Sequence, residues 1–269
     1  MIRVLLRISA GILVGALFLV AVAIRLSDHY INEEQRLVAA GDHKGAMQSI
    51  RMAARLDPFG PEPLELQAFL LQSQDNDQAA AASLREAVAR DPNNFVPYLL
   101  LANLQATALN DLDAGIKSYR KVLELNPHAT VASNALAQTL VRANRLEEAA
   151  KVYQKMKDDN QITIEGLYDL GRIYVRTGKP EKGLKYIRQA RLRVKKLTKE
   201  TKGSQRQQLK SLSNSMELAI ADALVVERRY DQARRVLQYS NADQAPAILQ
   251  LLNTDPEGYR RQVENSAIY

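Results

Sequence analysis

Aspartate or asparagine followed by proline recurs at a nearly constant interval in the first half of this chain. The three steps end at Pro58, Pro92 and Pro127, which are 34 and 35 residues apart. Small and bulky residues recur at fixed offsets before each proline: Ala46, Ile50, Ala53; Ala80, Leu84, Ala87; and Gly115, Tyr119, Val122. The spacing continues without the proline at Ala149, Tyr153, Met156 and at Gly183, Ile187, Ala190. A repeat of this length is typical of stacked supersecondary units.

The pattern within each unit predicts a helical hairpin. Proline removes an amide donor and clashes with the preceding turn, so it ends the second helix. Polar turns such as Asn76-Asp77 separate the two helices. Small residues let the two helices approach closely, and bulky residues fill the space between successive hairpins. The expected fold is all-α, a right-handed superhelical solenoid with a concave face. The alternative is an irregular helical bundle with a chance period.

These positions resemble the tetratricopeptide repeat (TPR). In that family the first helix carries a large residue, Leu-Gly or Leu-Ala, and a bulky residue; the second carries Ala, an aromatic or aliphatic residue, Ala and a final Pro. The best match is Leu167, Leu170-Gly171, Tyr174, Gly183, Ile187 and Ala190, followed by Leu136-Ala137, Leu140, Ala149 and Tyr153. A weaker sixth copy reads Ala221, Leu224, Ala233, Leu237. The resemblance implies about six hairpins, at 27–58, 59–92, 93–127, 128–160, 161–194 and 212–240, and a scaffold without a reaction of its own.

The amino-terminal segment is apolar enough to cross a membrane. Residues 8–24 carry no charge, and a spanning helix needs about 20 apolar residues. Arg7 lies near one end and can reach the headgroups. An uncleaved single-span anchor is the favoured interpretation, because the apolar stretch is longer than a usual signal-peptide core. A cleaved signal peptide is the alternative, since Ala21-Val22-Ala23 matches a cleavage site.

Flanking charges predict the orientation of this span. Arg3 and Arg7 precede it, whereas Arg25 follows it and is soon joined by acidic residues. The positive-inside rule then places the amino terminus in the cytoplasm and the repeats outside it, on the periplasmic or cell-surface side. Gly11 and Gly15 form a Gly-xxx-Gly step that can pair membrane helices, as in a homo-oligomer. The alternative is that glycine is simply common in membrane spans.

The residue content argues against catalysis. The chain has no cysteine and three scattered histidines, His29, His43 and His128. It lacks a set of ligands with metal-site spacing, a glycine-rich phosphate loop and a nucleophile elbow. We therefore expect no enzyme activity, no catalytic residues, no metal and no cofactor.

Positive charge is concentrated in one region. The whole chain has a net charge of +7, but Arg172–Lys210 alone holds 14 Lys or Arg and two Glu, a net +12. Its densest part supplies a predicted basic patch: Arg191, Arg193, Lys195, Lys196, Lys199 and Lys202. Such a patch suits anionic lipid, an acidic partner or a polyanionic glycan; a merely solvated helix face is the alternative. Without interleaved aromatic residues, nucleic acid is not the expected partner.

The resemblance also implies a partner-binding groove lined by the first helix of each repeat. The corresponding positions here are Glu65, Phe69, Leu99, Asn103, Asn134, Gln138, Tyr168 and Arg172. Amide side chains suit an extended peptide, and Arg172 suits a carboxylate. Leu99 stands where the family's carboxylate clamp has lysine, so a chaperone-tail clamp is unsupported. The alternative is a solvated groove without a partner.

We divide the chain into a transmembrane anchor at 1–26, repeats one to five at 27–194, a basic linker or helix extension at 195–211, and a degenerate sixth repeat with capping helices at 212–269. The expected function is a membrane-anchored scaffold that holds protein partners in or near the membrane and assists assembly of an envelope complex. One alternative is an exported binding protein for a polyanionic glycan. Another is a structural accessory subunit, with Phe69 and Tyr168 covered by a neighbouring subunit.

Overall fold

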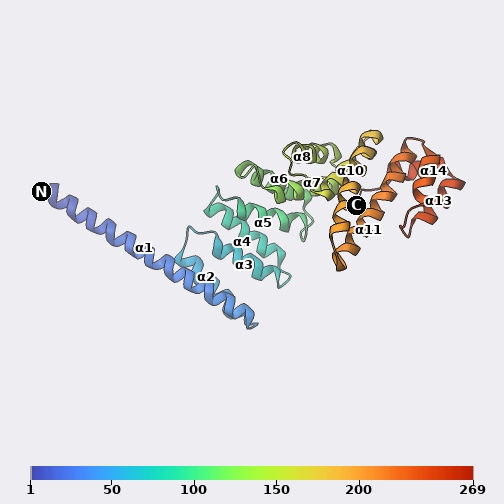
Figure 1. The fold of residues 1–269 in the computed structure, drawn as a ribbon. Helices are drawn as coiled ribbons and strands as arrows, with labels where there is room; N and C mark the ends of the chain where they lie inside the picture. Colours follow the sequence, from blue (N-terminus) through green and yellow to red (C-terminus); the bar gives the residue numbers. More distant parts are fainter. Residues whose placement is uncertain (1, 269) are drawn as a thin grey trace. The chain divides into compact units, whose positions relative to one another are not determined.

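The computed structural model describes residues 2–268, and describes the side chains of residues 12–268. All regular secondary structure within residues 2–268 is helical, in fourteen helices (Figure 1). The all-α solenoid of helical hairpins predicted from the repeat period is therefore confirmed.

Consecutive helices pack as hairpins throughout the described chain. The pairs are α1 (Ile2–Ala39) with α2 (His43–Leu56), α3 (Glu62–Gln72) with α4 (Asp77–Arg90), α5 (Phe95–Ala106) with α6 (Leu112–Leu125), α7 (Thr130–Arg142) with α8 (Leu146–Asp158), α9 (Ile164–Arg176) with α10 (Pro180–Glu200), α11 (Gly203–Val226) with α12 (Tyr230–Gln238), and α13 (Ala245–Thr254) with α14 (Pro256–Asn265).

The chain divides into two compact units, Met1–Pro127 and His128–Tyr269. The first contains α1–α6 and the second contains α7–α14. In each unit the repeat positions form the core. Tyr119, Tyr153 and Tyr174, expected to pack between helices, are all buried. The first unit's core includes a cluster of alanines and leucines from α3, α4 and α5: Ala68, Ala80, Ala81, Leu84, Leu101 and Leu104.

Each of the first six hairpins turns at a residue with left-handed backbone conformation. These residues are Gly41, Asp75, Asn110, Asn144, Gly178 and Arg228. The first five follow one another at 34 or 35 residues, whereas Arg228 comes 50 residues after Gly178. The added length lies in α10 and α11, which have 21 and 24 residues. Residues 195–211, expected as a basic linker or extension, are the end of α10, a short turn and the start of α11.

Small residues bring α9 and α10 together. A Cβ built on Gly171 would lie 2.9 Å from the Gly183 carbonyl oxygen, and one built on Gly183 would lie 2.5 Å from the Gly171 carbonyl oxygen. Only glycine fits at this spacing. The predicted role of the small repeat positions is thus confirmed in this hairpin.

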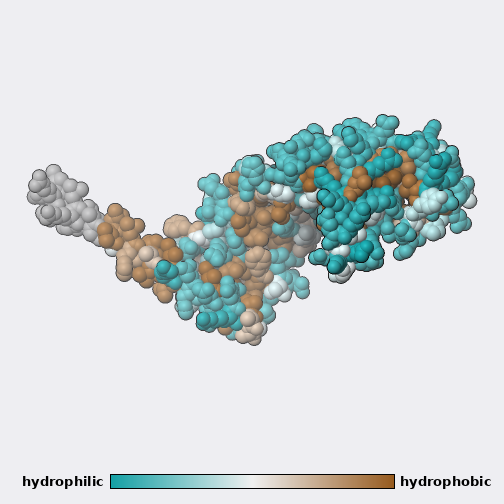
Figure 2. Space-filling model, viewed as in Figure 1, coloured by the Kyte–Doolittle hydropathy of each residue, from teal (hydrophilic) through white to brown (hydrophobic). Residues whose placement is uncertain are grey.

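Helix α1 joins an exposed apolar segment to the first hairpin without a break. Its apolar side chains between Ile12 and Leu26 are largely exposed, and Figure 2 shows them as a brown stretch of α1. From Ser27 onward α1 packs on α2: Ser27 is buried, and its Oγ donates to the Ala53 carbonyl oxygen at 3.1 Å. Within residues 12–268, the Ile12–Ala39 part of α1 is the one helical segment that is long and apolar enough to cross a membrane. A signal sequence has the same length and composition.

Candidate functional site

The second unit presents two arginines one turn apart on α9. Thr163 begins this helix by accepting a hydrogen bond from the Gly166 amide at 3.0 Å through its Oγ1. Residues four apart lie on the same helix face, so Tyr168, Arg172 and Arg176 line up one above another. Helices α11 and α14 pack against α9 on this side of the unit.

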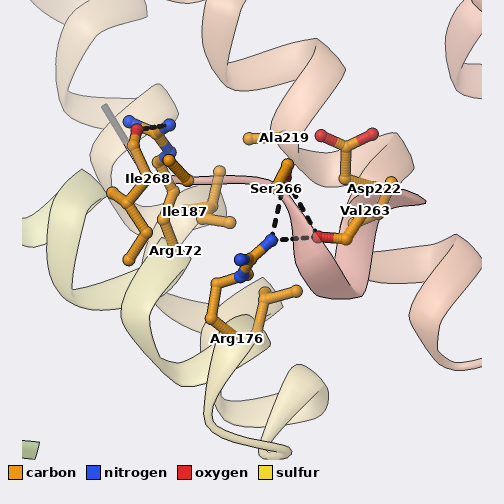
Figure 3. A pocket seen from close by; sticks show the side chains of 10 residues that line it. Arg172, Arg176, Ile187, Ala219, Asp222, Val263, Ser266 and Ile268 are labelled. Atoms are coloured by element: carbon orange, nitrogen blue, oxygen red, sulfur yellow. Dashed lines mark hydrogen bonds between the residues drawn. The ribbon is translucent and has the colours of Figure 1, made fainter. Parts of the chain in front are cut away.

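Both arginines bind the segment at the end of α14. Arg172 donates to the carbonyl oxygen of Ile268. Arg176 donates to the carbonyl oxygen of Val263 and, at 2.8 Å, to Ser266 Oγ (Figure 3). The chain leaves α14 at Ser266 with an extended backbone, φ −69° and ψ 149°. Two guanidinium groups therefore hold the main chain of residues 263–268, which comprise the last turn of α14 and the residues just after it, through charge-assisted hydrogen bonds.

Arg172 is held in place by its own neighbours. Its guanidinium lies 5.3 Å from the centre of the Tyr168 ring, and its Nη1 lies 3.9 Å from Asp169 Oδ1. Asp169 is buried and also accepts a hydrogen bond from the Tyr153 hydroxyl at 3.2 Å. The Tyr168 hydroxyl donates to the Ser215 carbonyl oxygen of α11 at 3.3 Å. Such contacts fix the direction in which the guanidinium points.

An apolar contact accompanies these polar ones. Ile268 is 6% exposed, although Ser266 and Ala267 beside it are exposed. A cavity of about 50 Å³ remains at this place. It is lined by the arginines, the segment itself and apolar side chains of α9, α10 and α11: Val175, Ile187 and Ala219 (Figure 3).

One carboxyl group lies in the same cavity. Burial raises the pKa of Asp222 to about 6, although the Tyr259 hydroxyl, which donates to its Oδ1 at 2.6 Å, and the charges of Arg172 and Arg176 oppose the rise. Burial and the neighbouring Asp222 raise the pKa of Tyr259, so its proton stays on the hydroxyl. Burial, and next the charge of Arg172, lower the pKa of Arg176. The site thus combines two guanidinium donors with a carboxyl that titrates near neutrality.

The predicted groove residues lie on the first helices of their repeats. On α3, Glu65 is half-buried, and burial and then Glu62 raise its pKa, whereas Phe69 is 52% exposed. On α5, Asn103 Oδ1 already accepts from the Tyr119 hydroxyl at 2.5 Å.

The two predicted groove residues on α7 differ in exposure. Gln138 is exposed, whereas Asn134 is half-buried and its Oδ1 has no hydrogen-bond partner within residues 2–268. Two of the predicted groove residues, Tyr168 and Arg172, contact each other, and both are also bound by other residues of the chain.

The predicted basic patch is split by an ion pair. Arg191 pairs with Glu217 of α11, whose second carboxylate oxygen accepts from Ser240 Oγ at 2.8 Å. The other members, Arg193, Lys195, Lys196, Lys199 and Lys202, are exposed. An open pocket of about 520 Å³ lies between the end of α10 and the start of α11, and its basic lining comes from Lys195, Lys199, Arg206 and Lys210.

The proposed helix-pairing step lies in the exposed part of α1. Gly15 has no atom within 4 Å of a Cβ built on it, apart from the helix itself. Gly11 lies outside the residues whose side chains are described. In the described part of the chain there is no group of three His, Asp or Glu side chains that could hold a metal ion.

Sequence reasoning missed Arg176, Asp222 and Ile268. Two signals were available: Arg176 lies one turn after Arg172 on the same face, and Ile268 is an apolar residue in a polar carboxyl-terminal region. Neither signal indicates that the two would meet, because the bond between Arg172 and Ile268 joins residues 96 positions apart.

Comparisons with known proteins agree with this fold. Residues 106–162 and 164–190 match models of the tetratricopeptide-repeat family, so the chain contains tetratricopeptide repeats. No curated protein matches the chain.

Solved structures of similar fold are distant in sequence. A MamA protein is 19% identical over 66% of this chain and 97% of its own, with a TM-score of 0.58. PilF of Pseudomonas aeruginosa is 14% identical over 89% of this chain and 96% of its own, with a TM-score of 0.54. YrrB, described as a TPR protein with an unusual peptide-binding site, is 18% identical over 60% of this chain and 82% of its own, with a TM-score of 0.51. The comparisons therefore show an all-helical fold of stacked hairpins, with tetratricopeptide repeats at residues 106–162 and 164–190.

Proposed function

We propose that this chain is a membrane-tethered adaptor that binds extended segments of partner proteins in the grooves formed by the first helices of its repeats. The partners are proteins in or near the membrane, and the outcome is assembly of an envelope or membrane complex. The repeats lie outside the cytoplasm, a placement supported by the positive charges before the span and the acidic residues after it.

One observation carries the proposal: Arg172 and Arg176, on a groove-lining face, hold main-chain carbonyl oxygens of residues 263–268. Main-chain carbonyls are present in every polypeptide, so donors aimed at them suit a partner of the same chemistry. The structural likeness to YrrB, with its peptide-binding site, supports the same interpretation. On the first helices of other repeats, exposed Gln138 offers an amide that can bind a main-chain carbonyl, and exposed Phe69 offers an apolar contact.

The tether follows from α1. Its exposed apolar part leads without a break into the residues that pack on α2, so an uncleaved span would hold the first hairpin directly at the membrane surface. Confinement to a membrane raises the effective concentration of any membrane-bound partner.

A second candidate function is supported by the basic pocket between α10 and α11. Lys195, Lys199, Arg206 and Lys210 suit a polyanion, either the headgroups of anionic lipid or a glycan. In this version the amino-terminal segment is cleaved near Ala23 and the exported chain binds a polyanionic glycan.

Capture of partners tests the adaptor. Full-length tagged protein is purified from membranes in mild detergent, and the bait and its partners are identified by mass spectrometry. We expect an intact amino terminus and stoichiometric protein partners. Replacing Asn134 and Gln138 with Ala should reduce capture at least about fivefold with little change in melting temperature, since neither residue belongs to the buried apolar core.

Gln48→Ala with Gln189→Ala is the matched control, because both are exposed amides on second helices, α2 and α10. Equal capture by wild type, test variant and control would contradict groove binding. A bait cleaved near Ala23 without protein partners would instead favour the glycan-binding alternative.

A further inference from the structure

We infer that residues 263–268 are a built-in competitor: they occupy the α9–α11 site in place of a partner segment, which must displace them to bind. The inference rests on the proposed function, and it names both the chemistry of the partner segment and how its access is regulated.

The segment is bound as a ligand would be bound. Its main chain is extended at Ser266, and beyond the end of α14 the Ile268 carbonyl oxygen accepts a hydrogen bond from Arg172 of α9. The Val263 carbonyl oxygen, in the last turn of α14, accepts from Arg176 and from Ser266 Oγ. Val263 and Ile268 are buried, whereas residues 264–267 between them are exposed. The segment is thus held at its two ends by apolar side chains, as a docked peptide is held by its anchors.

The contacts occur at positions where the repeat register places partner-binding side chains. Arg172 is one of these positions, and Arg176 follows one turn later on the same face. A structural cap needs only to cover the apolar end of the last repeat. Arg176 binds a carbonyl oxygen in the last turn of α14, as a cap can, but Arg172 binds the Ile268 carbonyl oxygen beyond the end of that helix, which a cap does not require.

The occupied site defines what a partner must supply. It needs a main-chain carbonyl oxygen for each of Arg172 and Arg176 and a branched apolar side chain in the place of Ile268. An open pocket lies beside the segment, and Val175, Ile187 and Ala219 form the apolar part of its lining. A partner with a larger apolar side chain at this place would make more contacts with these side chains.

Competition follows from the segment's covalent attachment. Helix α14 packs on α11 and is held there by the hydrogen bond from Tyr259 to Asp222, so the segment stays beside the site at high effective concentration. A site that is free for only a tenth of the time binds an added peptide about tenfold more weakly than an open site.

The test uses the full-length chain in mild detergent and a fluorescent peptide with the sequence of residues 256–268 as the probe. Binding is measured by anisotropy for wild type and for Ile268→Asp, which places a charge in the apolar contact. Ile268→Asp should bind the peptide at least about tenfold more tightly than wild type, and adding Arg172→Ala and Arg176→Ala to this variant should abolish the gain. The control Gln262→Asp adds the same charge at an exposed position of α14 and should behave as wild type.

Hydrogen exchange gives a second measurement that needs no variant. Excess peptide should accelerate exchange of residues 263–268 in the wild-type chain. Equal peptide affinity of wild type and Ile268→Asp, or unchanged exchange with saturating peptide, would overturn the competition. Partner capture that depends on Asn134 and Gln138 would then leave the adaptor function standing. A gain by Ile268→Asp without any captured partner would refute the adaptor, and would show only that residues 263–268 cover a peptide-binding site.

Discussion

At the scale of single residues, Asp222 makes the second unit respond to pH. Its carboxyl has a pKa of about 6, raised from 3.8 mainly by burial, in the same cavity as Arg172 and Arg176. As the pH falls through 6, the folded chain takes up a proton that the unfolded chain takes up only near 3.8. This group therefore makes the folded state more stable as the pH falls from 7 to 4, and less stable as the pH rises again.

Replacing Asp222 with Asn should remove this response while keeping an oxygen that accepts the hydrogen bond from Tyr259. The free energy of unfolding of wild type relative to the variant should rise by about 1 to 3 kcal/mol between pH 7 and pH 4. Urea unfolding of both chains at several pH values, followed by circular dichroism, measures the difference. Parallel pH profiles for the two chains would show that Asp222 keeps an ordinary pKa.

Whether the role of a residue could be predicted depended on whether its partner belongs to the repeat pattern. Tyr119, Tyr153 and Tyr174 repeat with the period, and their burial follows from the pattern. Arg176 and Asp222 do not repeat, and they acquire their roles from α14, which lies about 30 or more residues further along the chain. Loop closure over such distances leaves no periodic trace in a single sequence.

At the scale of elements, the α9–α10 hairpin depends on two glycines that meet. A Cβ on Gly183 would lie 2.6 Å from Val175 Cγ2 and 2.9 Å from the Val175 amide nitrogen, in addition to its contact with the Gly171 carbonyl. Backbone atoms cannot move aside as a flexible side chain can. The two helices would have to separate, and this would disturb Arg172 and Arg176 on the same hairpin.

Gly183→Ala should therefore destabilise the chain by about 1 to 3 kcal/mol, although alanine is the better helix former. Lys185→Ala on the same helix is the control, since Lys185 is exposed, and it should change stability by less than about 0.5 kcal/mol. Thermal unfolding of the three chains measures the effect. A Gly183→Ala chain as stable as the control would mean that α9 and α10 are further apart than described.

The elements themselves were largely predictable. The steps ending at Pro58, Pro92 and Pro127 mark the ends of α2, α4 and α6. The turn residues with left-handed backbone conformation recur at intervals of 34 or 35 residues and so follow the same period. The added residues of α10 and α11 coincide with the basic run, whose like charges interrupt the apolar pattern. The sequence therefore indicated an extension here, but it did not predict where α10 would end and α11 would begin. Helix α14 was expected as a cap, and its packing on α9 and α11 was not predicted.

At the scale of the whole molecule, charge is separated along the chain. Arg172–Lys210 carries a net +12 although the complete chain carries only +7, so the remaining residues are acidic overall. Part of this positive charge is neutralised internally, as in the pair of Arg191 with Glu217. The exposed lysines around the pocket between α10 and α11 are the part open to a polyanion, and their contribution must depend on salt.

Heparin serves as a simple polyanion to measure that contribution. Lys195→Gln with Lys199→Gln should weaken binding to the full-length chain about thirtyfold at low salt, at about 1 kcal/mol for each lysine near an anionic surface. The slope of log affinity against log salt should also fall by about 1 to 2, because fewer counterions are released. The control Lys44→Gln with Lys117→Gln makes the same change of net charge at exposed positions of the first unit and should have a smaller effect. Equal losses in both pairs would show that heparin responds to net charge alone, and the α10–α11 lysines would then be a solvated face and not a binding site.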